Sequence, residues 1–451
     1  MVTISYLTKE SVRASVIILA LSAATNTLAQ STGNAIERAL AYTVKIRNGI
    51  DTPFIEDLKG AGFAAGFLVD VEKGWIVTNA HVAGHSPARL QVRFREGDFF
   101  DAEQLYVDPY LDLAVLKIPP SKLPPGTNAA EFECEQNPPV GEAVAALGHP
   151  WSLPFTATRG IISGSSFFDD REWLQTDAPL NAGNSGGPLI NLTSGKVVGI
   201  GTASVSDDES ENLNFAVAAK FVCRVLDILR DGKDPSPPQL WALFVSNLQE
   251  RDRLVVADTF GRDGNTPLKR GDTILRVEGN SATIRNESQL LDILRGKDGH
   301  ATMIVERNGQ ETSIDIALSP VPNVLSRYGL RFSGLLVAES PLRDDYDSTE
   351  NKRLMVHYVE EGSIADFEGF SEWHIILAVD GAKFRDLESL RAYLIGVESS
   401  GKNVSFLVRK WTSLNDRLRE YWQFEIPIQN VDTLVSEAPT LDAPDALVSS
   451  R

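Results

Sequence analysis

The stretch NAGNSGGPL, residues 181–189, places Ser185 among three glycines and just ahead of a proline. Glycine accepts positive φ and the close approach of other atoms, so such a loop can point its backbone amides at a bound group. A serine hydroxyl attacks a carbonyl group at neutral pH only when a nearby base removes its proton. The residues alone therefore leave two interpretations open, an ordinary turn or the nucleophile of a hydrolase.

A base and an acid that could serve this serine come earlier in the chain. His81, in TNAHV, ends one apolar segment, and Asp112, in DLAVLKI, precedes another. A histidine base needs such a carboxylate to fix its tautomer and orientation. Two other histidines, His85 and His149, lie in turn-like surroundings, and Asp108 precedes a proline, which favours a turn. His81 and Asp112 are therefore the candidate partners of the serine.

The chain around these residues is a succession of short predicted strands. Apolar runs such as GWIVTNAHV, DLAVLKI and KVVGIGTA are separated by turn residues, with no long helix between them. This pattern favours antiparallel β-barrels over a βαβ fold. A helix is expected to follow, with an apolar face formed by Phe221, Val222, Val225, Leu226 and Leu229.

Two proline-rich stretches, residues 231–239 and 319–323, divide the rest of the chain and favour extended linkers. The segments after them share a pattern of a strand, a turn at Gly279 or Gly381, and an amphipathic helix. Such repetition predicts duplicated small modules. Residues 431–451 mix proline, acidic and small residues, which predicts a flexible acidic tail.

Taken together, the motifs TNAHV, DLAVLKI and GNSGGPL, in the order His, Asp, Ser, resemble those of the trypsin-like serine proteases of the HtrA (Deg) family. Three motifs in this order, followed by two PDZ-like repeats, are far more specific than any one of them. The resemblance covers nearly all of the mature chain. It implies a mainly β protein, in which a chymotrypsin-like double β-barrel protease domain precedes two α+β PDZ domains. The implied parts are a signal peptide at 1–29, the protease domain at 30–232, PDZ domains at 239–320 and 324–430, and the tail at 431–451.

The resemblance also implies roles for single residues. Ser185 would attack the peptide carbonyl, His81 would act as general base and then general acid, and Asp112 would orient His81. The backbone amides of Gly183 and Ser185, with Asn184 shaping the turn between them, would form the oxyanion hole. Digestive proteases carry an aspartate where this chain has Asn184, so activation by zymogen cleavage is not expected.

A substrate pocket is only partly defined by the sequence. The position at which a basic-specific trypsin carries its pocket aspartate is Pro179 here, so cleavage after Lys or Arg is not expected. Small or apolar walls would suit aliphatic side chains. The predicted substrate-binding residues are Leu180, Asn181, Ala182, Gly201, Thr202 and Ala203.

PDZ domains bind an extended C-terminus by strand addition and hold its carboxylate in backbone amides. In the last module, YGLRF resembles the carboxylate-binding loop, which assigns Tyr328, Gly329 and Leu330 to it. In the first module the corresponding place, LWALFV, departs from the family pattern. Whether that module binds peptides or only packs stays open.

Composition limits the partners. The net charge of −18 argues against nucleic acid or an anionic membrane as the main partner. No cofactor and no metal site are expected, because the six histidines and two cysteines show no ligand spacing. Unfolded proteins and C-terminal peptides are the expected ligands. The family resemblance implies a homotrimer, built through the region around Ala39 to Arg47, or a multiple of it.

The first residues resemble an export signal, because Lys9 and Arg13 precede an apolar run that ends in small residues. The run is short for a membrane span, so cleavage near Ala29 and a periplasmic or otherwise exported location are expected. A first helix of the fold and an uncleaved anchor are the alternatives. Cys134 and Cys223 could pair, although two separate buried thiols are the commoner state of such a pair.

Three functions from different classes are compatible with these features. The first is an exported endopeptidase that degrades misfolded or damaged proteins. The second is a chaperone that holds unfolded chains with little turnover, and the third is a peptide-sensing scaffold based on the PDZ modules. The presence of His81, Asp112 and Ser185 together favours the endopeptidase.

Overall fold

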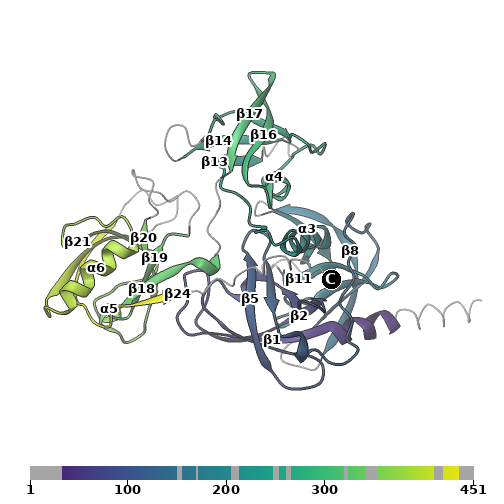
Figure 1. Ribbon diagram of the computed structural model, residues 1–451, viewed down its shortest axis with the longest axis horizontal. Coiled ribbons are helices and arrows are strands. Elements are labelled where there is room, and N and C mark those ends of the chain that lie inside the picture. The colour runs from purple at the N-terminus through teal and green to yellow at the C-terminus, as the bar shows by residue number, and fades with distance from the viewer. Residues whose placement is uncertain are drawn as a thin grey trace, which may run out of the picture.

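The computed structural model describes residues 33–149, 155–168, 171–204, 213–246, 253–260, 266–318, 324–341, 353–410 and 420–435. The protein is mainly β, as predicted. Residues 33–42 are helical and lead into two closed six-stranded barrels, with strand orders β1-β2-β3-β6-β5-β4 and β10-β11-β12-β9-β8-β7 (Figure 1). All pairings in both barrels are antiparallel, which explains why short loops suffice to connect them.

The first barrel contains β1 (Thr43–Ile50), β2 (Gly60–Asp70), β3 (Trp75–Thr78), β4 (Arg89–Arg93), β5 (Phe100–Asp108) and β6 (Leu113–Lys117), with the short helices α2 (Ala80–Ala83) and η1 (Pro120–Lys122). The second contains β7 (Ala143–Gly148), β8 (Thr156–Phe168), β9 (Arg171–Thr176), β10 (Pro188–Asn191), β11 (Val197–Ser204) and β12 (Asn214–Ala218). One continuous apolar core joins them.

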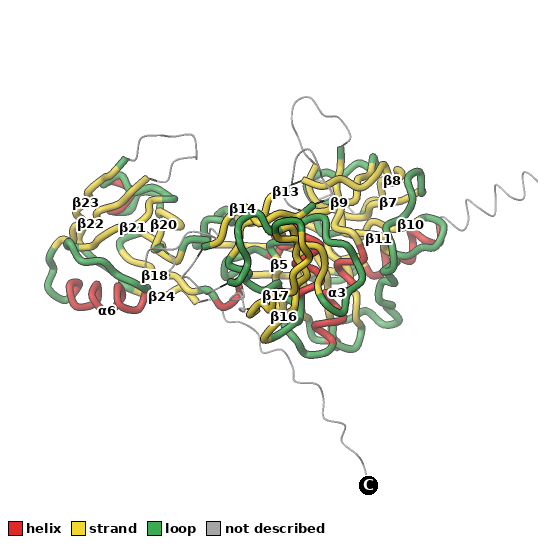
Figure 2. Tube along the Cα trace, turned by 90° about the horizontal axis from the view of Figure 1, so that it is seen from above, coloured by secondary structure: helices red, strands yellow, loops and turns green. Residues whose placement is uncertain are grey.

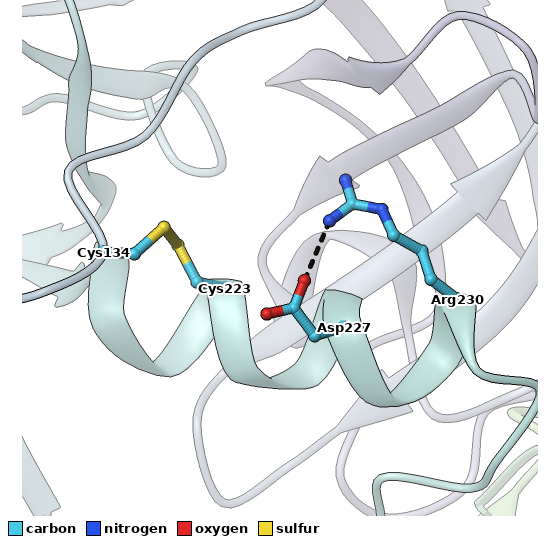
Figure 3. The surroundings of a disulfide bond; sticks show 4 residues. All are labelled: Cys134, Cys223, Asp227 and Arg230. Carbon is cyan, nitrogen blue, oxygen red and sulfur yellow. Dashed lines mark hydrogen bonds and ion pairs between the residues drawn. A yellow bond between two sulfur atoms is a disulfide. The ribbon is translucent and has the colours of Figure 1, made fainter.

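Helix α3 (Ala219–Arg230) follows the second barrel and packs against β11 and β12. The five residues predicted to form its apolar face are all buried, so this prediction is confirmed. The helix also carries one half of a disulfide. Cys223 is bonded to Cys134 of the loop before β7, with the two Cα atoms 5.9 Å apart, whereas separate thiols were the commoner expectation. Figure 3 shows this bond together with the Asp227–Arg230 ion pair on the same helix.

The first sheet unit, residues 240–318, is a five-stranded antiparallel sheet in the order β13 to β17, with its own apolar core. Helix α4 covers it, and its first turn is capped by Asn286, whose side chain accepts a hydrogen bond from the Gln289 amide. Its elements are β13 (Ala242–Ser246), β14 (Leu254–Thr259), β15 (Thr273–Val277), α4 (Glu287–Leu294), β16 (Gly299–Arg307) and β17 (Gln310–Leu318).

The second sheet unit, residues 324–435, repeats this plan with a capped helix, α6, whose cap Asp386 accepts from the Ser389 amide. Its sheet has the order β23-β22-β21-β20-β19-β18-β24, and it lies to one side of the barrels in both views (Figures 1 and 2). Its elements are η3 (Val324–Ser326), β18 (Tyr328–Phe332), β19 (Leu335–Glu339), β20 (Leu354–Val359), α5 (Ile364–Phe367), β21 (His374–Val379), α6 (Leu387–Glu398), β22 (Asn403–Lys410), β23 (Tyr421–Pro427) and β24 (Asp432–Val435).

The prediction of a flexible tail from residue 431 is wrong for residues 432–435, which form strand β24. Residues 432–435 pair antiparallel with β18, and Arg331 forms an ion pair with Asp432 across the two strands. Four residues in this stretch suffice for a strand because β18 offers them a free ladder of backbone groups. The remainder of the predicted tail, and the predicted signal peptide, lie outside the described residues.

Candidate active site

His81 and Asp112 are brought together by two neighbouring elements of the first barrel. His81 lies in α2, just after β3, and Asp112 ends the turn between β5 and β6. Strand β6 pairs with β3, so the two residues lie at neighbouring strand ends. The His81 Nδ1 atom is 2.9 Å from Asp112 Oδ1 and 3.0 Å from Oδ2, and the His81 amide also donates to Oδ1 at 3.1 Å. The imidazole is half exposed. Its Nε2 is therefore left for a group on the solvent side.

The Asp112 carboxylate is held by more than the histidine. The Thr202 hydroxyl, on β11 of the second barrel, donates to Oδ2 at 2.6 Å, and the Asn79 side chain donates to the Asp112 backbone carbonyl. Burial raises the pKa of Asp112, but the hydrogen bonds and charge of His81 and the Thr202 hydroxyl outweigh it, so the pKa lies below its ordinary value. The carboxylate is therefore ionised at neutral pH.

Ser185 lies in a turn over residues 182–186 that is fixed by glycine chemistry. Gly186 has φ of +83°, and a Cβ there would lie 2.1 Å from Thr78 Oγ1. A Cβ on Gly187 would lie 1.9 Å from the Leu147 carbonyl oxygen. Only glycine allows this approach to both barrels. The Ser185 carbonyl in turn accepts from the Ala65 amide of β2 at 2.9 Å, which ties the turn to the first barrel.

The amides of Gly183 and Ser185 in this turn remain available to a ligand. Other polar groups of the turn are already bonded: the Asn184 amide donates to the Asn181 carbonyl at 2.9 Å, and the Gly183 carbonyl accepts from the His149 amide at 3.0 Å. Within the part of the chain that the structure describes, no group accepts a hydrogen bond from the amides of Gly183 and Ser185. Gly183 has φ of +103°, a conformation that glycine adopts without strain.

His81 and Ser185 line one cavity of about 590 Å³ between the barrels. Gly183 and Ala182 line the same cavity on the serine side. The loop between β1 and β2 and the first residues of β2 also line it, at positions 56–64. A peptide that entered this cavity would reach the serine, the histidine and the two available amides together.

The predicted substrate-pocket residues fall into different places. Ala182 lines the cavity, as noted, and Asn181 is exposed beside it. Leu180 is buried and touches Gly201, whose backbone hydrogen bonds hold Gly186 and Gly187. The Thr202 side chain donates its hydrogen bond to Asp112, and Ala203 is the next residue of β11.

The residues assigned to the PDZ carboxylate loop form part of a strand. Tyr328, Gly329 and Leu330 begin β18, and all three pair with β24. Leu330 is buried in the core of the second sheet unit. A Cβ on Gly329 would meet Leu336 at 2.6 Å and Phe54 of the β1–β2 loop at 3.2 Å. In this arrangement the outer edge of β18 is occupied by the chain itself.

Thr202 and Asn79 were not predicted from the sequence to be partners of Asp112. Asn79 could have been noticed, because it stands two residues before His81 in TNAHV. Thr202 lies ninety residues after Asp112, and no local pattern connects the two.

Residues 64–200 match the family model described as a trypsin-like peptidase domain. A probable periplasmic serine endoprotease DegP-like from Chlamydia pneumoniae is 29% identical to this chain over 374 residues, which cover 78% of this chain and 74% of that protein. The chain is a trypsin-like serine endoprotease related to the DegP/HtrA proteins. A protein of the same description from Brucella suis biovar 1 is 28% identical over 372 residues, covering 76% of this chain and 70% of its own length.

The solved structure of the HtrA-type protease AlgW with tripeptide has the same fold, with a TM-score of 0.52 and 24% identity. The match covers 64% of this chain and 98% of that chain. The predicted fold is therefore supported by this structure, and the trypsin-like domain match and the DegP-like relatives confirm the predicted resemblance for the protease. No helix in the described ranges of this DegP/HtrA relative is long and apolar enough to cross a membrane.

Proposed function

We propose that this protein cleaves peptide bonds with Ser185 as nucleophile, His81 as general base and acid, and Asp112 as the group that orients the imidazole. The observation that carries the proposal is the bond from His81 Nδ1 to Asp112, which leaves Nε2 toward the cavity that Ser185 also lines. The ionised, buried Asp112 favours the tautomer with its proton on Nδ1 and stabilises the imidazolium that forms later.

The reaction proceeds in two acyl transfers. As Ser185 Oγ forms a bond to the substrate carbonyl carbon, His81 Nε2 takes the hydroxyl proton. The carbonyl oxygen becomes an oxyanion, to which the amides of Gly183 and Ser185 donate hydrogen bonds. His81 then gives its proton to the leaving amine as the C–N bond breaks. Water repeats the sequence on the acyl-enzyme and releases the new carboxyl end.

The proposed substrates are unfolded or damaged proteins that enter as extended segments. Leu58 and Phe63 line the same cavity as Ser185, and both large apolar side chains are exposed, Leu58 by 89%. Exposed apolar groups at a cleft favour segments that folded proteins keep buried. The similar proteins from Chlamydia pneumoniae and Brucella suis are described as periplasmic, which supports an exported location after cleavage near Ala29.

We further propose that the two sheet units, within the boundaries 239–320 and 324–430, are PDZ modules that bind peptide C-termini. In the first unit, β13 lies at the edge of the described sheet and pairs only with β14, so strand addition has an available site there. In the second unit, a peptide that adds to Tyr328–Leu330 must first displace β24. A homotrimer of the protease domain is the proposed assembly, which sedimentation would test.

Casein hydrolysis tests the catalytic proposal. The wild-type chain should degrade unfolded casein, and Ser185→Ala should degrade it on the order of a millionfold more slowly. Casein binding should persist in the variant, because only one hydroxyl is removed and the exposed apolar side chains of Leu58 and Phe63 remain in the cavity lining. Equal hydrolysis by wild type and variant would exclude Ser185 as the nucleophile. Binding without hydrolysis by the wild type would instead favour the chaperone function.

A further inference from the structure

A buried ion pair joins the first sheet unit to the turn that carries Asp112. Arg295 caps the C-terminal end of α4, and its side chain is 2% exposed. It forms an ion pair with Asp108, at the end of β5, whose side chain is fully buried. The same guanidinium nitrogen donates to the carbonyl of Pro235 in the linker at 2.9 Å. Two charges buried in this way are stable only while they remain paired.

Asp108 uses its two carboxylate oxygens for different tasks. Oδ1 accepts from the backbone amides of Tyr110 and Leu111, at 2.9 and 3.0 Å, and so closes the turn between β5 and β6. Oδ2 accepts from the Tyr106 hydroxyl at 3.0 Å and faces Arg295. The oxygen that shapes the turn and the oxygen that faces the sheet unit therefore belong to the same carboxylate.

The turn leads directly to the catalytic acid. Asp112 follows Leu111 and has φ of +52°, an unfavourable conformation for a residue with a side chain. Such a conformation persists only where its surroundings fix it. The Tyr110 side chain, in the same turn, packs against the core of the first sheet unit. The sheet unit thus contacts the turn both through a charge and through an apolar side chain.

We propose that Arg295 is a positioning residue for catalysis, because it neutralises Asp108 and thereby holds the 108–112 turn that places Asp112 against His81. The proposal rests on the proposed triad. Among the described residues, only Arg295 forms an ion pair with Asp108, so removing Arg295 leaves this carboxylate without a cation. The buried carboxylate must then take up a proton or draw in water, and either event disturbs its hydrogen bonds to the turn. Misplacement by about 1 Å at a catalytic group can cost a hundredfold in rate.

Four variants in the full chain test this role. Arg295→Met removes the charge and keeps much of the apolar volume. Arg295→Met with Asp108→Asn also removes the stranded carboxylate, and the asparagine oxygen can still accept from the two turn amides. Arg276→Met is the matched control, since Arg276 forms an exposed pair with Glu311 at 2.9 Å in the same unit. Ser185→Ala reports on the triad itself.

The measurements are kcat and KM for an unfolded substrate and the rate of labelling by a fluorophosphonate. Arg295→Met should lower kcat and the labelling rate about tenfold or more, with little change in KM, while Arg276→Met should leave both unchanged. The double variant should recover to within about threefold of wild type, because the turn no longer holds an unpaired charge.

Two results would overturn the proposal. Arg295→Met as active as Arg276→Met would show that the turn does not need the cation. A double variant no better than Arg295→Met would show that Arg295 only joins the two units. If Arg295→Met fails to fold, the double variant alone decides, because it is expected to fold and to be active. Full activity in Ser185→Ala would refute the triad and, with it, the role of Arg295 in holding Asp112 for that triad, whereas the two results above would leave the triad intact.

Discussion

We expect the contact between the second sheet unit and the wall of the active-site cleft to weaken in acid, because His357 forms part of this contact. This histidine lies on β20, buried against the β1–β2 loop. Its Nδ1 accepts a hydrogen bond from the Ile55 amide at 3.1 Å, and its Nε2 donates to the Glu339 carbonyl at 2.9 Å. Phe54 packs edge-on against the ring. The ring must be neutral to accept from Ile55, so protonation and this contact exclude each other.

Burial lowers the pKa of His357 from 6.5 to about 4, and the neighbouring Arg327 acts in the same direction. The packed state disfavours the protonated form of His357. The stabilisation of the contact by neutral His357 is therefore fully present above pH 6.5 and declines as the pH falls toward 4. The whole shift corresponds to about 3 kcal/mol, of which about 2 kcal/mol is lost at pH 5. This is roughly a thirtyfold change in the opening equilibrium of the contact.

Hydrogen exchange detected by mass spectrometry can measure this opening in the full chain. Protection of residues 51–60, corrected for the intrinsic exchange rates, should fall roughly thirtyfold between pH 7.5 and pH 5. His357→Gln is the control, because its side chain does not titrate. Asp57, in the same loop, stays ionised at pH 5, since hydrogen bonds from His85 and Ser86 lower its pKa despite burial. Protection that is equal at both pH values, or that falls equally in His357→Gln, would refute the assignment.

Three other substitutions follow from the site and its support. Thr202→Val removes the 2.6 Å bond to Asp112 and should lower kcat about tenfold or more, whereas Thr202→Ser should retain most of it; equal activity of the two would exclude this role. Gly186→Ala would bring a Cβ to 2.1 Å from Thr78 Oγ1 and should abolish hydrolysis, while Gly97→Ala, with positive φ but open space, should stay active. Replacing both disulfide cysteines by serine should lower the free energy of unfolding by about 4 kcal/mol, because the bond closes a long loop of 89 residues; an unchanged denaturation midpoint would contradict this.

The sequence predicted those features that depend on local patterns. Short apolar runs separated by turn residues predicted the barrels, and helical spacing predicted the buried face of α3. The motifs identified His81 and Ser185, which line one cleft, and Asp112, which binds His81, because each motif lies at the end of a strand or in a tight turn. Glycine content predicted the turn over 182–186, since only glycine allows the approach of Thr78 and Leu147.

Features that depend on contacts between segments far apart in the sequence could not be predicted from local patterns. Thr202 reaches Asp112 across the two barrels, and Arg295 reaches Asp108 from another unit, so neither pair leaves a local pattern. The disulfide depends on where α3 packs. Strand β24 was predicted as tail because its few residues have no core of their own, and it forms through pairing with β18.

Labelling with a fluorophosphonate, followed by peptide mapping, tests the central claim most directly. The reagent forms a stable bond to a serine hydroxyl only where a base activates it, and His81 is placed to do so at Ser185. The wild-type chain should carry one label, on the peptide that contains Ser185, and Ser185→Ala should carry none. Label on a different serine, or equal labelling of the Ser185→Ala chain, would contradict the proposed active site.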